Sequence, residues 1–249
     1  MSKSESALMP DDDIELFVGY RPDSARFDSV SVEPGEATAM ILDRIPSGSR
    51  LLDVGCGTGV LASLVQRTCN ATVLGVEPDP VRAEMARSKG VEVVCGYFDE
   101  SLASEVGQFD VIILVDVIEH LQTPARLIRL LLKSLKPGGF IVLSVPNVAH
   151  WSMRLSLLTG RFNYSATGLC DATHLRWFTR LSLLQFLDRM GLDVTEGGCT
   201  IGRGLSAYRR RPFSWIPNNL KVKMLRRLSQ LWPEGFGCQF IVEIRPRQC

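Results

Sequence analysis

The amino-acid sequence predicts an α/β protein with a doubly wound, mainly parallel sheet of seven strands, an antiparallel strand near the C-terminus and helical insertions. Short apolar runs alternate with helical patterns from residue 36 to about 200, the order that builds β-α-β units. The run 109–115 is almost continuously apolar, which is typical of a strand buried on both faces. With 249 residues, 45% of them hydrophobic, the chain is long enough to form a substantial core.

The first elements are separated by clear turn signals. Pro46 and Gly48 predict a turn before the first strand, and the glycines of 55–59 predict a turn that opens a helix. Apolar runs and helical patterns then alternate regularly. The expected strands in this part are 50–54, 72–76 and 91–95, and the expected helices are 60–68 and 80–89.

The middle of the chain continues this alternation. After the strand at 109–115, the segment 124–135 has leucines and isoleucine on one face and basic residues on another, as an amphipathic helix requires. The sequence KPGG at 136–139 predicts the helix end and a turn. The next strand is expected at 140–145, and Pro146 ends it.

The pattern changes after Pro146. Residues 148–179 are expected to be irregular and are rich in Trp, Arg and His. Thr179 is expected to cap a helix that runs through Met190 and ends at Gly191. Two further strands are expected around a basic, tryptophan-containing insertion at 203–235, namely 192–201 and 236–244.

These elements predict one domain at 36–249, preceded by an N-terminal lid segment at 1–35. The segments 148–179 and 203–235 are expected as insertions on the substrate side. No window approaches 18 apolar residues, which excludes a membrane-spanning helix, and the first residues lack the apolar core of a signal peptide. Seven scattered cysteines without a C-x-x-C pair favour a reduced protein, so the expected location is cytoplasmic.

The sharpest local signal is LLDVGCGTG at residues 51–59, which follows a strand and opens a helix. Its glycines let the backbone turn sharply and approach a ligand. Asp53 at the strand end would repel a pyrophosphate and attract an ammonium group. Glu77 follows Gly55 by 22 residues, the expected place for a carboxylate that accepts ribose hydroxyls. The pattern therefore favours a ligand with a ribose and a positive charge; the alternative is a glycine-rich turn without a ligand.

Four segments together resemble the successive motifs of class I S-adenosylmethionine-dependent methyltransferases: LLDVGCGTG, VLGVEPDP (73–80), FDVIILVDVIEHL (109–121) and LKPGGFIVLSVPN (135–147). The resemblance covers about residues 36–200 and implies S-adenosyl-L-methionine as the cofactor. It implies a cofactor site made of Asp53, Gly55, Cys56, Gly57, Gly59, Glu77 and Pro78. Against the adenine it implies either Tyr97 with Phe98 or Asp99, and on the methionine side it implies Val115 with Asp116.

A narrower resemblance concerns the segments 145–162 and 171–179, which look like a bacterial subgroup of methionine-biosynthesis W-type proteins and cell-envelope sugar methyltransferases. It implies O-methylation of a sugar, a glycolipid precursor or a small hydroxyl compound, with a small-molecule or lipid-linked glycan as acceptor. Two other functions remain as alternatives. One is a non-catalytic partner of a biosynthetic enzyme, which the intact 53–59 motif disfavours. The other is an RNA methyltransferase, which the net charge of +1 disfavours.

The candidate catalytic residues are His120, His174 and Asp116. Histidine titrates near neutral pH and can assist deprotonation of a hydroxyl acceptor, and Asp116 is expected near the transferring methyl. Asp116, Glu119 and His120 form D-x-x-E-H, and His174 could complete a set of cation ligands. The alternative interpretation is that Glu119 and His120 support the loop beside the cofactor. No metal is assigned.

The C-terminal part of the chain is basic. Residues 201–249 hold ten Lys and Arg against Glu234 and Glu243. Within 208–232, leucines and a methionine recur at helical spacing beside lysines and arginines, with tryptophans at the flanks. Such a helix can lie on an anionic membrane surface, which would place the protein peripherally on the inner membrane face. The alternative is that its apolar stripe packs on the domain itself or across a dimer. The oligomeric state is not defined by the sequence.

Overall fold

A computed structural model describes residues 31–247, so most of the expected lid at 1–35 lies outside the described residues. Within this range seven strands form one sheet with the order β3-β2-β1-β4-β5-β7-β6. All neighbours are parallel except β7, which runs antiparallel to both β5 and β6. The strands are β1 (Arg50–Val54), β2 (Thr72–Glu77), β3 (Glu92–Cys95), β4 (Phe109–Val115), β5 (Leu135–Pro146), β6 (Leu192–Cys199) and β7 (Gln239–Pro246). The predicted doubly wound α/β fold is confirmed.

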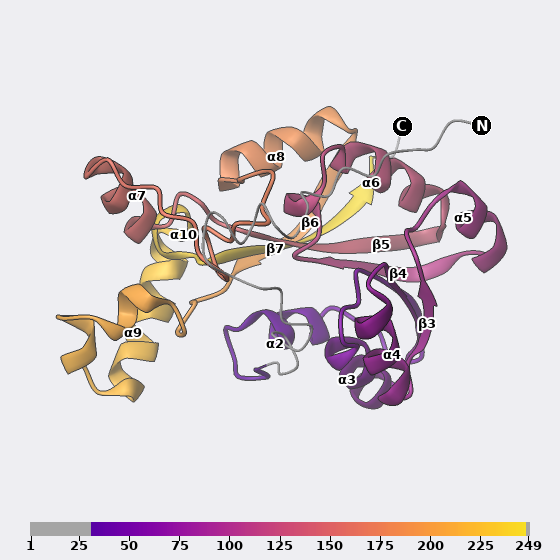
Figure 1. The fold of residues 1–249 in the computed structure, drawn as a ribbon, viewed down its shortest axis with the longest axis horizontal. Helices are drawn as coiled ribbons and strands as arrows, with labels where there is room; N and C mark the ends of the chain where they lie inside the picture. The colour runs from indigo at the N-terminus through magenta and orange to yellow at the C-terminus, as the bar shows by residue number, and fades with distance from the viewer. Residues whose placement is uncertain (1–30, 248–249) are drawn as a thin grey trace.

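Helices cover both faces of the sheet (Figure 1). Successive side chains of β1 point to opposite faces, so Leu51 joins one hydrophobic cluster and Leu52 the other. The helices α2 (Ala37–Leu42), α3 (Val60–Cys69) and α4 (Pro80–Ser88) pack into the cluster that contains Leu51. The cluster with Leu52 receives α5 (Glu100–Val106), α6 (Pro124–Lys133) and α8 (Arg180–Arg189). Burial on two faces explains why β4 is apolar almost throughout.

The predicted turn at KPGG is wrong. Residues 136–139 lie inside β5, which begins at Leu135. The register with β4 shifts there, because Phe109 pairs with Leu135 while Val111 pairs with Phe140. The extra residues therefore bulge out of a continuous strand, and Gly138 adopts a φ of 80° in this bulge. The residues KPGG do change the backbone direction locally, but the pairings on both sides keep the segment within β5.

Within the described residues, four helices were not predicted, among them the short α2 before β1. The expected irregular segment 148–179 contains α7 (Trp151–Leu158), and α5 fills the connection before β4. The short α10 (Pro233–Phe236) replaces the expected start of the last strand at 236. The expected cap of α8 is confirmed: Thr179 and Ser182 form a reciprocal capping box, which satisfies backbone N–H groups at the helix start.

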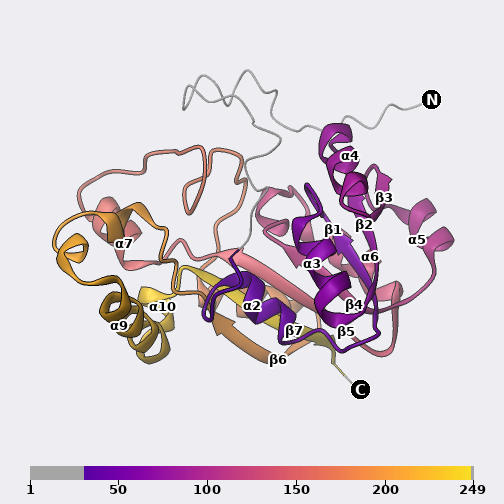
Figure 2. The ribbon, with the colours of Figure 1, turned by 90° about the horizontal axis from the view of Figure 1, so that it is seen from below.

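A lobe at one end of the molecule combines α7 with the 203–235 insertion. The insertion holds the 3₁₀ turns η2 (Ser206–Arg209) and η3 (Phe213–Trp215), followed by α9 (Asn218–Leu231). Figure 2 shows α7, α9 and α10 together beyond the end of the sheet. No helix within residues 31–247 is both long and apolar enough to cross a membrane.

His150 links the two halves of this lobe. The ring is fully buried, with Nε2 at 2.9 Å from the Tyr208 hydroxyl and Nδ1 at 2.8 Å from Ser152 Oγ. Burial lowers the pKa of His150 to about 4, so the imidazole is neutral. Trp151 Nε1–H donates to the same Tyr208 oxygen at 3.1 Å. Contacts from Tyr208 and Trp151 therefore cover the ring.

Candidate functional site

A pocket of about 1520 Å³ opens at the carboxyl ends of β1, β2, β3 and β4. Ligands bind at this edge in open α/β sheets, because the loops after parallel strands converge there. The pocket is lined by nearly all the residues that the sequence predicted for the site: Asp53, Gly55, Cys56, Gly57, Glu77, Pro78, Tyr97, Phe98, Val115, Asp116, His120 and His174. Gly59 is the exception.

The glycine turn after β1 is shaped by positive backbone angles. Gly55 has a φ of 76° and Gly57 a φ of 56°, conformations that residues with a Cβ rarely adopt. A Cβ on Gly55 would lie 2.8 Å from Val117, whereas a Cβ on Gly57 would meet nothing within 4 Å. Gly55 is therefore needed for packing against the segment after β4. At Gly57 the open space leaves room for a ligand to approach the backbone.

Gly59 and the Cys56 side chain serve the fold. A Cβ on Gly59 would lie 2.7 Å from the Cα of Ala86, so Gly59 allows α3 to approach α4 closely. The Cys56 thiol packs against Gly75, where an added Cβ would lie 2.7 Å from the sulfur. Burial, with smaller contributions from Asp53 and Glu77, raises the pKa of Cys56 far above its usual value, so the thiol stays protonated. Cys56 therefore lines the pocket, but its protonated thiol is not a nucleophile.

Glu77 holds the glycine turn in place. Its side chain is buried at the end of β2. The Gly57 N–H donates to Oε2 at 2.8 Å, and the Asp79 N–H donates to Oε1 at 3.0 Å. A carboxylate has about four acceptor positions, so two remain for hydroxyl donors in the pocket. Glu77 can thus both lock the turn and accept a pair of ribose hydroxyls.

Asp53 gives the pocket a buried negative charge when it is ionised. Only 2% of its surface is exposed. Burial, and secondly the repulsion from Glu77, raise the pKa of Asp53 to about 7. A cationic group bound beside Asp53 would relieve this cost, because an opposite charge favours the ionised carboxylate. The site therefore favours a positively charged ligand at this place, as the sequence predicted for an ammonium group.

The segment after β3 provides aromatic surface on one side of the pocket. Tyr97 is largely exposed at the rim, and Phe98 is buried in the hydrophobic cluster beneath it. Asp99 caps α5 by accepting a hydrogen bond from the Leu102 N–H at 2.9 Å. Because this cap occupies Asp99, the alternative in which Tyr97 and Phe98 pack against a flat ring fits the geometry better.

Asp116 follows β4 with a φ of 54°, an unusual value for a residue with a side chain. The Ser144 hydroxyl donates to Asp116 Oδ1 at 2.8 Å and accepts from the Asp116 N–H at 3.0 Å. Gln239 Nε2 also donates to Oδ1. Two neighbouring strands, β5 and β7, therefore aim this carboxylate into the pocket.

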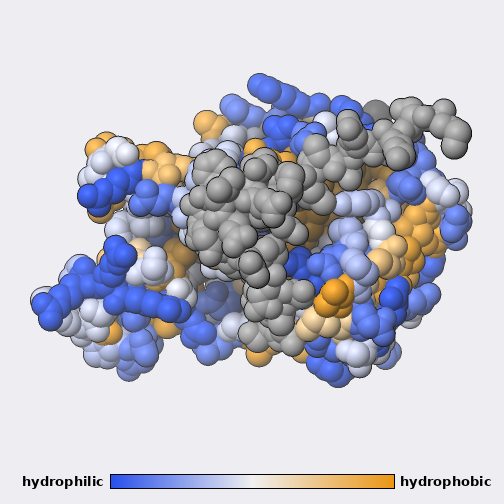
Figure 3. Space-filling model, viewed as in Figure 1, coloured by the Kyte–Doolittle hydropathy of each residue, from blue (hydrophilic) through white to orange (hydrophobic). Residues whose placement is uncertain are grey.

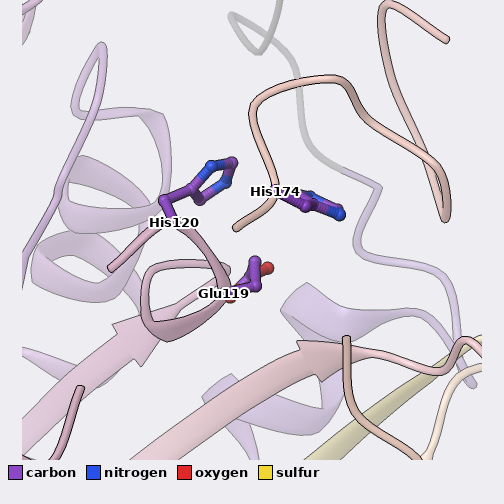
Figure 4. A group of neighbouring side chains, drawn as sticks. All are labelled: Glu119, His120 and His174. Carbon is purple, nitrogen blue, oxygen red and sulfur yellow. The ribbon is translucent and has the colours of Figure 1, made fainter. Parts of the chain in front are cut away.

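Glu119, His120 and His174 lie close together at the pocket (Figure 4). Glu119 and His120 belong to the 3₁₀ turn η1 (Ile118–His120), and His174 comes from the loop before α8. The two imidazole centroids are 4.9 Å apart at an angle of 71°. The Glu119 carboxylate is buried, and neither of its oxygens has a hydrogen-bond partner among residues 31–247. Burial, then the charge of Asp116, raises the pKa of Glu119 well above its usual value.

The loop before α8 is attached to η1 by its backbone. The N–H groups of Leu175 and Arg176 both donate to the Glu119 carbonyl, at 2.9 and 3.0 Å. The carbonyl of Thr173 lies 3.1 Å from His120 Nδ1, as does the Thr173 hydroxyl oxygen. That hydroxyl donates to Asp171 Oδ1 at 2.6 Å.

These contacts define the tautomer of His120. A carbonyl oxygen can only accept, so Nδ1 carries the proton and Nε2 is the acceptor nitrogen. The Thr173 hydroxyl gives its proton to Asp171, so its oxygen can also accept from Nδ1. Asp171 and Thr173 are therefore positioning residues for His120. The segment 171–179 was marked by its resemblance, but the contact with His120 was not predicted, because it joins residues 53 positions apart.

The same three side chains could hold a cation. One atom of Glu119, one of His120 and one of His174 lie within 4.8 Å of one another. A carboxylate with two imidazoles suits a borderline divalent metal. The other arrangement is a protonated imidazole that compensates the Glu119 charge without a metal. Asp116, the first residue of the D-x-x-E-H pattern, instead bonds to Ser144 and Gln239.

The chain is similar to known proteins in family, sequence and structure. A family model described as a methyltransferase domain matches residues 29–196. The ubiquinone biosynthesis O-methyltransferase of Xanthomonas oryzae pv. oryzae is 36% identical over 134 residues, which is 51% of this chain and 55% of that protein. The chain thus spans about half the length of the curated relatives it matches.

Two solved structures are similar in fold. One is a SAM-dependent methyltransferase of Thermotoga maritima, described as a possible histamine N-methyltransferase, with a TM-score of 0.55, 17% identity and coverage of 84% of this chain and 87% of that one. The other, from Thiobacillus denitrificans, was solved with S-adenosyl-L-homocysteine; its TM-score is 0.51, its identity 19% and its coverage 84% and 90%. At these identities the similarity supports the architecture of the sheet and its flanking helices.

Proposed function

The chain belongs to the methyltransferase domain family, and from this membership we propose that it transfers the methyl group of S-adenosylmethionine to a hydroxyl oxygen of a small acceptor. Membership confirms the predictions of an enzyme, of a methyltransferase and of S-adenosylmethionine as the cofactor. The choice of oxygen and the nature of the acceptor belong to the proposal. The observation that carries it is the oriented His120 beside the glycine turn, because a hydroxyl acceptor benefits from a base where an aligned methyl donor is held.

The residues of the pocket fit the cofactor. When bound, S-adenosylmethionine supplies an electrophilic methyl group on a sulfonium. Asp53 would hold the ammonium group, since its buried carboxylate favours a cation. Glu77 would accept the ribose hydroxyls with its remaining acceptor positions. The open space at Gly57 would let the cofactor approach the backbone there. Tyr97 and Phe98 would flank the adenine.

His120 is the proposed base for the acceptor hydroxyl. Asp171 and Thr173 keep the proton on Nδ1, so Nε2 is the nitrogen that takes the acceptor proton. Once protonated, the imidazolium would be stabilised by the Glu119 carboxylate in the same cluster. His174 lies edge-on to His120 and is proposed to help orient the acceptor. Asp116, held by two strands, would lie beside the reacting methyl.

The acceptor is proposed to be a sugar, a glycolipid precursor or another small hydroxyl compound. The wall opposite the glycine turn carries Tyr164, Trp177 and Leu169, all of which line the pocket. Phe162 supports this wall by edge contacts with Tyr164 and Trp177, with centroids 5.6 Å away in both cases. Aromatic faces can stack on sugar or quinone rings. The O-methyltransferase name of the Xanthomonas relative supports oxygen as the nucleophile.

Titration calorimetry with S-adenosylhomocysteine tests the cofactor site. Replacing Glu77→Ala removes charged acceptors for two hydroxyls and should weaken binding by about 1.5–3 kcal/mol. Glu92→Ala is the matched control, because Glu92 is an exposed glutamate on the adjacent strand β3. No measurable binding to the wild-type protein would refute a working cofactor site and would favour the non-catalytic partner alternative. Equal affinities for both variants would refute the role of Glu77.

A further inference from the structure

The lobe that contains α7 and α9 is formed by two segments, 148–170 and 201–233, which we call the basic lobe. They are joined through the buried His150–Tyr208 hydrogen bond of 2.9 Å. The guanidinium of Arg154 on α7 also lies over the ring of Trp232 at the end of α9, at 5.2 Å. Both views of the ribbon place α7 and α9 at the same end of the molecule (Figures 1 and 2). The lobe is therefore one surface built from two distant parts of the sequence.

The two segments of this lobe are strongly basic, and the nearest acidic residues, Asp171 and Glu234, follow directly at their ends. These two segments contain ten of the 28 Lys and Arg residues of the chain and none of its 27 Asp and Glu residues. The net charge of +1 for the whole protein conceals this separation. Most of the basic side chains of the lobe are exposed, including Arg209, Arg210, Lys223 and Arg227. A surface of this kind attracts anionic partners.

Large apolar side chains lie exposed among these charges. On α7, Leu158 is 84% exposed, and Leu155 and Leu157 are more than half exposed. On the insertion, Leu231 is 74% and Trp215 67% exposed. Within α9 the buried positions are Leu225 and Ser229, so the ends of the expected apolar stripe face outward. Figure 3 shows hydrophobic surface over α7 and hydrophilic surface over α9 at this end of the molecule.

We propose that the basic lobe docks on a lipid surface that carries anionic headgroups. Lysines and arginines would contact the headgroups, while the leucines and tryptophans would enter the boundary with the acyl chains. RNA would use only the charges and would leave the leucines exposed to water. A second copy of the chain in a symmetric dimer would bring two surfaces of the same positive sign together, which opposes association. A lipid surface is the occupant that uses both properties.

Docking of this lobe would place the acceptor wall of the pocket near the bilayer. The segment that follows α7 continues to Tyr164 and Leu169, which line the pocket. An acceptor with a lipid tail could then present its headgroup to the pocket while the tail remains in the membrane. This consequence for the acceptor rests on the proposed function, whereas docking itself does not.

Vesicle cosedimentation of the full chain tests the proposal. The probes are phosphatidylcholine vesicles with and without phosphatidylglycerol, each at low and high NaCl. We expect binding to the anionic vesicles that falls as salt rises, and at least about tenfold weaker binding to the neutral ones. Binding of S-adenosylhomocysteine is measured on the same preparations, so that a failure of docking is distinguished from a failure of the cofactor site.

Charge and apolar contributions are separated by surface variants. Replacing Arg210, Lys223 and Arg227 with Gln should lower partitioning about a hundredfold, because each basic residue near an anionic surface contributes about fivefold. The matched control replaces Arg129, Lys133 and Arg189, which are exposed on α6 and α8. It should reproduce wild-type partitioning.

The second variant is Leu158→Asp, which should lower partitioning about tenfold. Its control is Leu181→Asp on α8, where the leucine is 65% exposed. The proposal is overturned if the control variants on α6 and α8 lose as much vesicle binding as the lobe variants do. Equal absence of binding to both kinds of vesicle also overturns it. Retention on single-stranded RNA without vesicle binding would assign the lobe to nucleic acid, and a dimer that Leu158→Asp dissociates would assign it to a second copy.

Discussion

The pocket and the basic lobe carry charges of opposite sign. Eight carboxylates line the pocket: Asp53, Glu77, Asp79, Asp99, Glu100, Asp116, Glu119 and Asp171. The segments of the basic lobe contain none. Several of the carboxylates are buried, whereas the lobe keeps its arginines and lysines in solvent. One chain thus combines a pocket lined by carboxylates with an exposed basic surface, and the net charge of +1 reveals neither.

The two regions also use histidine in opposite ways. His120 in the pocket has an oriented acceptor nitrogen, whereas His150 in the lobe has both nitrogens engaged by neighbouring hydroxyls. Replacement of each therefore separates catalysis from stability. His120→Ala should lower turnover by about 10²–10⁴-fold, as for other general bases, with cofactor affinity and melting temperature close to wild type. Steady-state kinetics with a hydroxyl compound that the wild-type protein methylates measures this loss.

The control for His120→Ala is His174→Ala, because the two rings share one cluster. We expect a smaller loss of turnover for His174→Ala, expressed mainly in KM. If both variants turn over at the wild-type rate, alignment of the reactants alone carries catalysis.

His150→Ala should act on the lobe and not on chemistry. It removes a buried ring and leaves the Tyr208 hydroxyl with one partner fewer, at a cost of about 2–4 kcal/mol in the free energy of unfolding. Burial already raises the pKa of Tyr208 to about 12, so its hydroxyl remains a neutral group in need of partners. Urea unfolding followed by tryptophan fluorescence measures the cost. An unchanged unfolding midpoint would contradict the role of this hydrogen bond in joining the two segments.

Asp53 should make cofactor binding depend on pH. Its pKa of about 7 in the folded protein lies above the ordinary value of 3.8, so the folded protein takes up a proton there. Stability from this group is present at low pH and is lost as pH rises through the folded pKa. Binding of a cationic ligand requires the ionised form, so affinity for S-adenosylhomocysteine should fall up to about tenfold per pH unit below pH 7. Calorimetry in buffers of different ionisation enthalpy detects the released proton.

Asp53→Asn sharpens this prediction. The variant should bind S-adenosylhomocysteine more weakly and without the pH dependence. At pH 8 the free protein should be more stable than wild type by on the order of 2 kcal/mol, since an unfavourable buried charge is gone. A variant that loses both affinity and stability at pH 8 would show that Asp53 is held ionised by contacts with the rest of the site.

The smallest effect is expected from removal of metal ions. The proposed mechanism uses an imidazole base and needs no cation at Glu119, His120 and His174. Dialysis against a chelator should therefore change turnover by less than about twofold. A loss of activity that zinc or another divalent ion restores would assign these three side chains to a metal. The base would then have to be sought elsewhere.

The sheet was largely predictable from the sequence, because each strand carries its own signal. The bounds of β1 and β4 agree with the expectation, since a glycine turn ends one and apolar residues fill the other. α7 was missed because its eight residues include few that become buried, with Met153 as the buried side chain, so no apolar stripe stands out. The sequence also did not predict which face of α9 is buried. Helical spacing shows that apolar residues share a face, but not which face another segment will cover.

The pocket was predictable where residues follow strand ends, and not where loops meet. Asp53 and Glu77 stand at the ends of neighbouring strands, so parallel pairing brings them together. The positions of Asp171 and Thr173 depend on a loop whose backbone bonds to Glu119. Ser144 meets Asp116 because β5 pairs with β4, and Gln239 meets it because β7 inserts beside β5. Sequence distance hides such contacts even though each residue is visible.

The paired hydrogen bonds from Leu175 and Arg176 to the Glu119 carbonyl have an evolutionary consequence. The loop they anchor carries the acceptor wall and also the group that sets the tautomer of His120. A lineage that exchanged this loop to accept a new compound would also replace Thr173, the hydrogen-bond partner of the proposed base His120. Under the proposed function, substrate range and proton transfer would be inherited together, and new specificity would arise more readily by point changes at Tyr164 or Trp177 than by loop replacement.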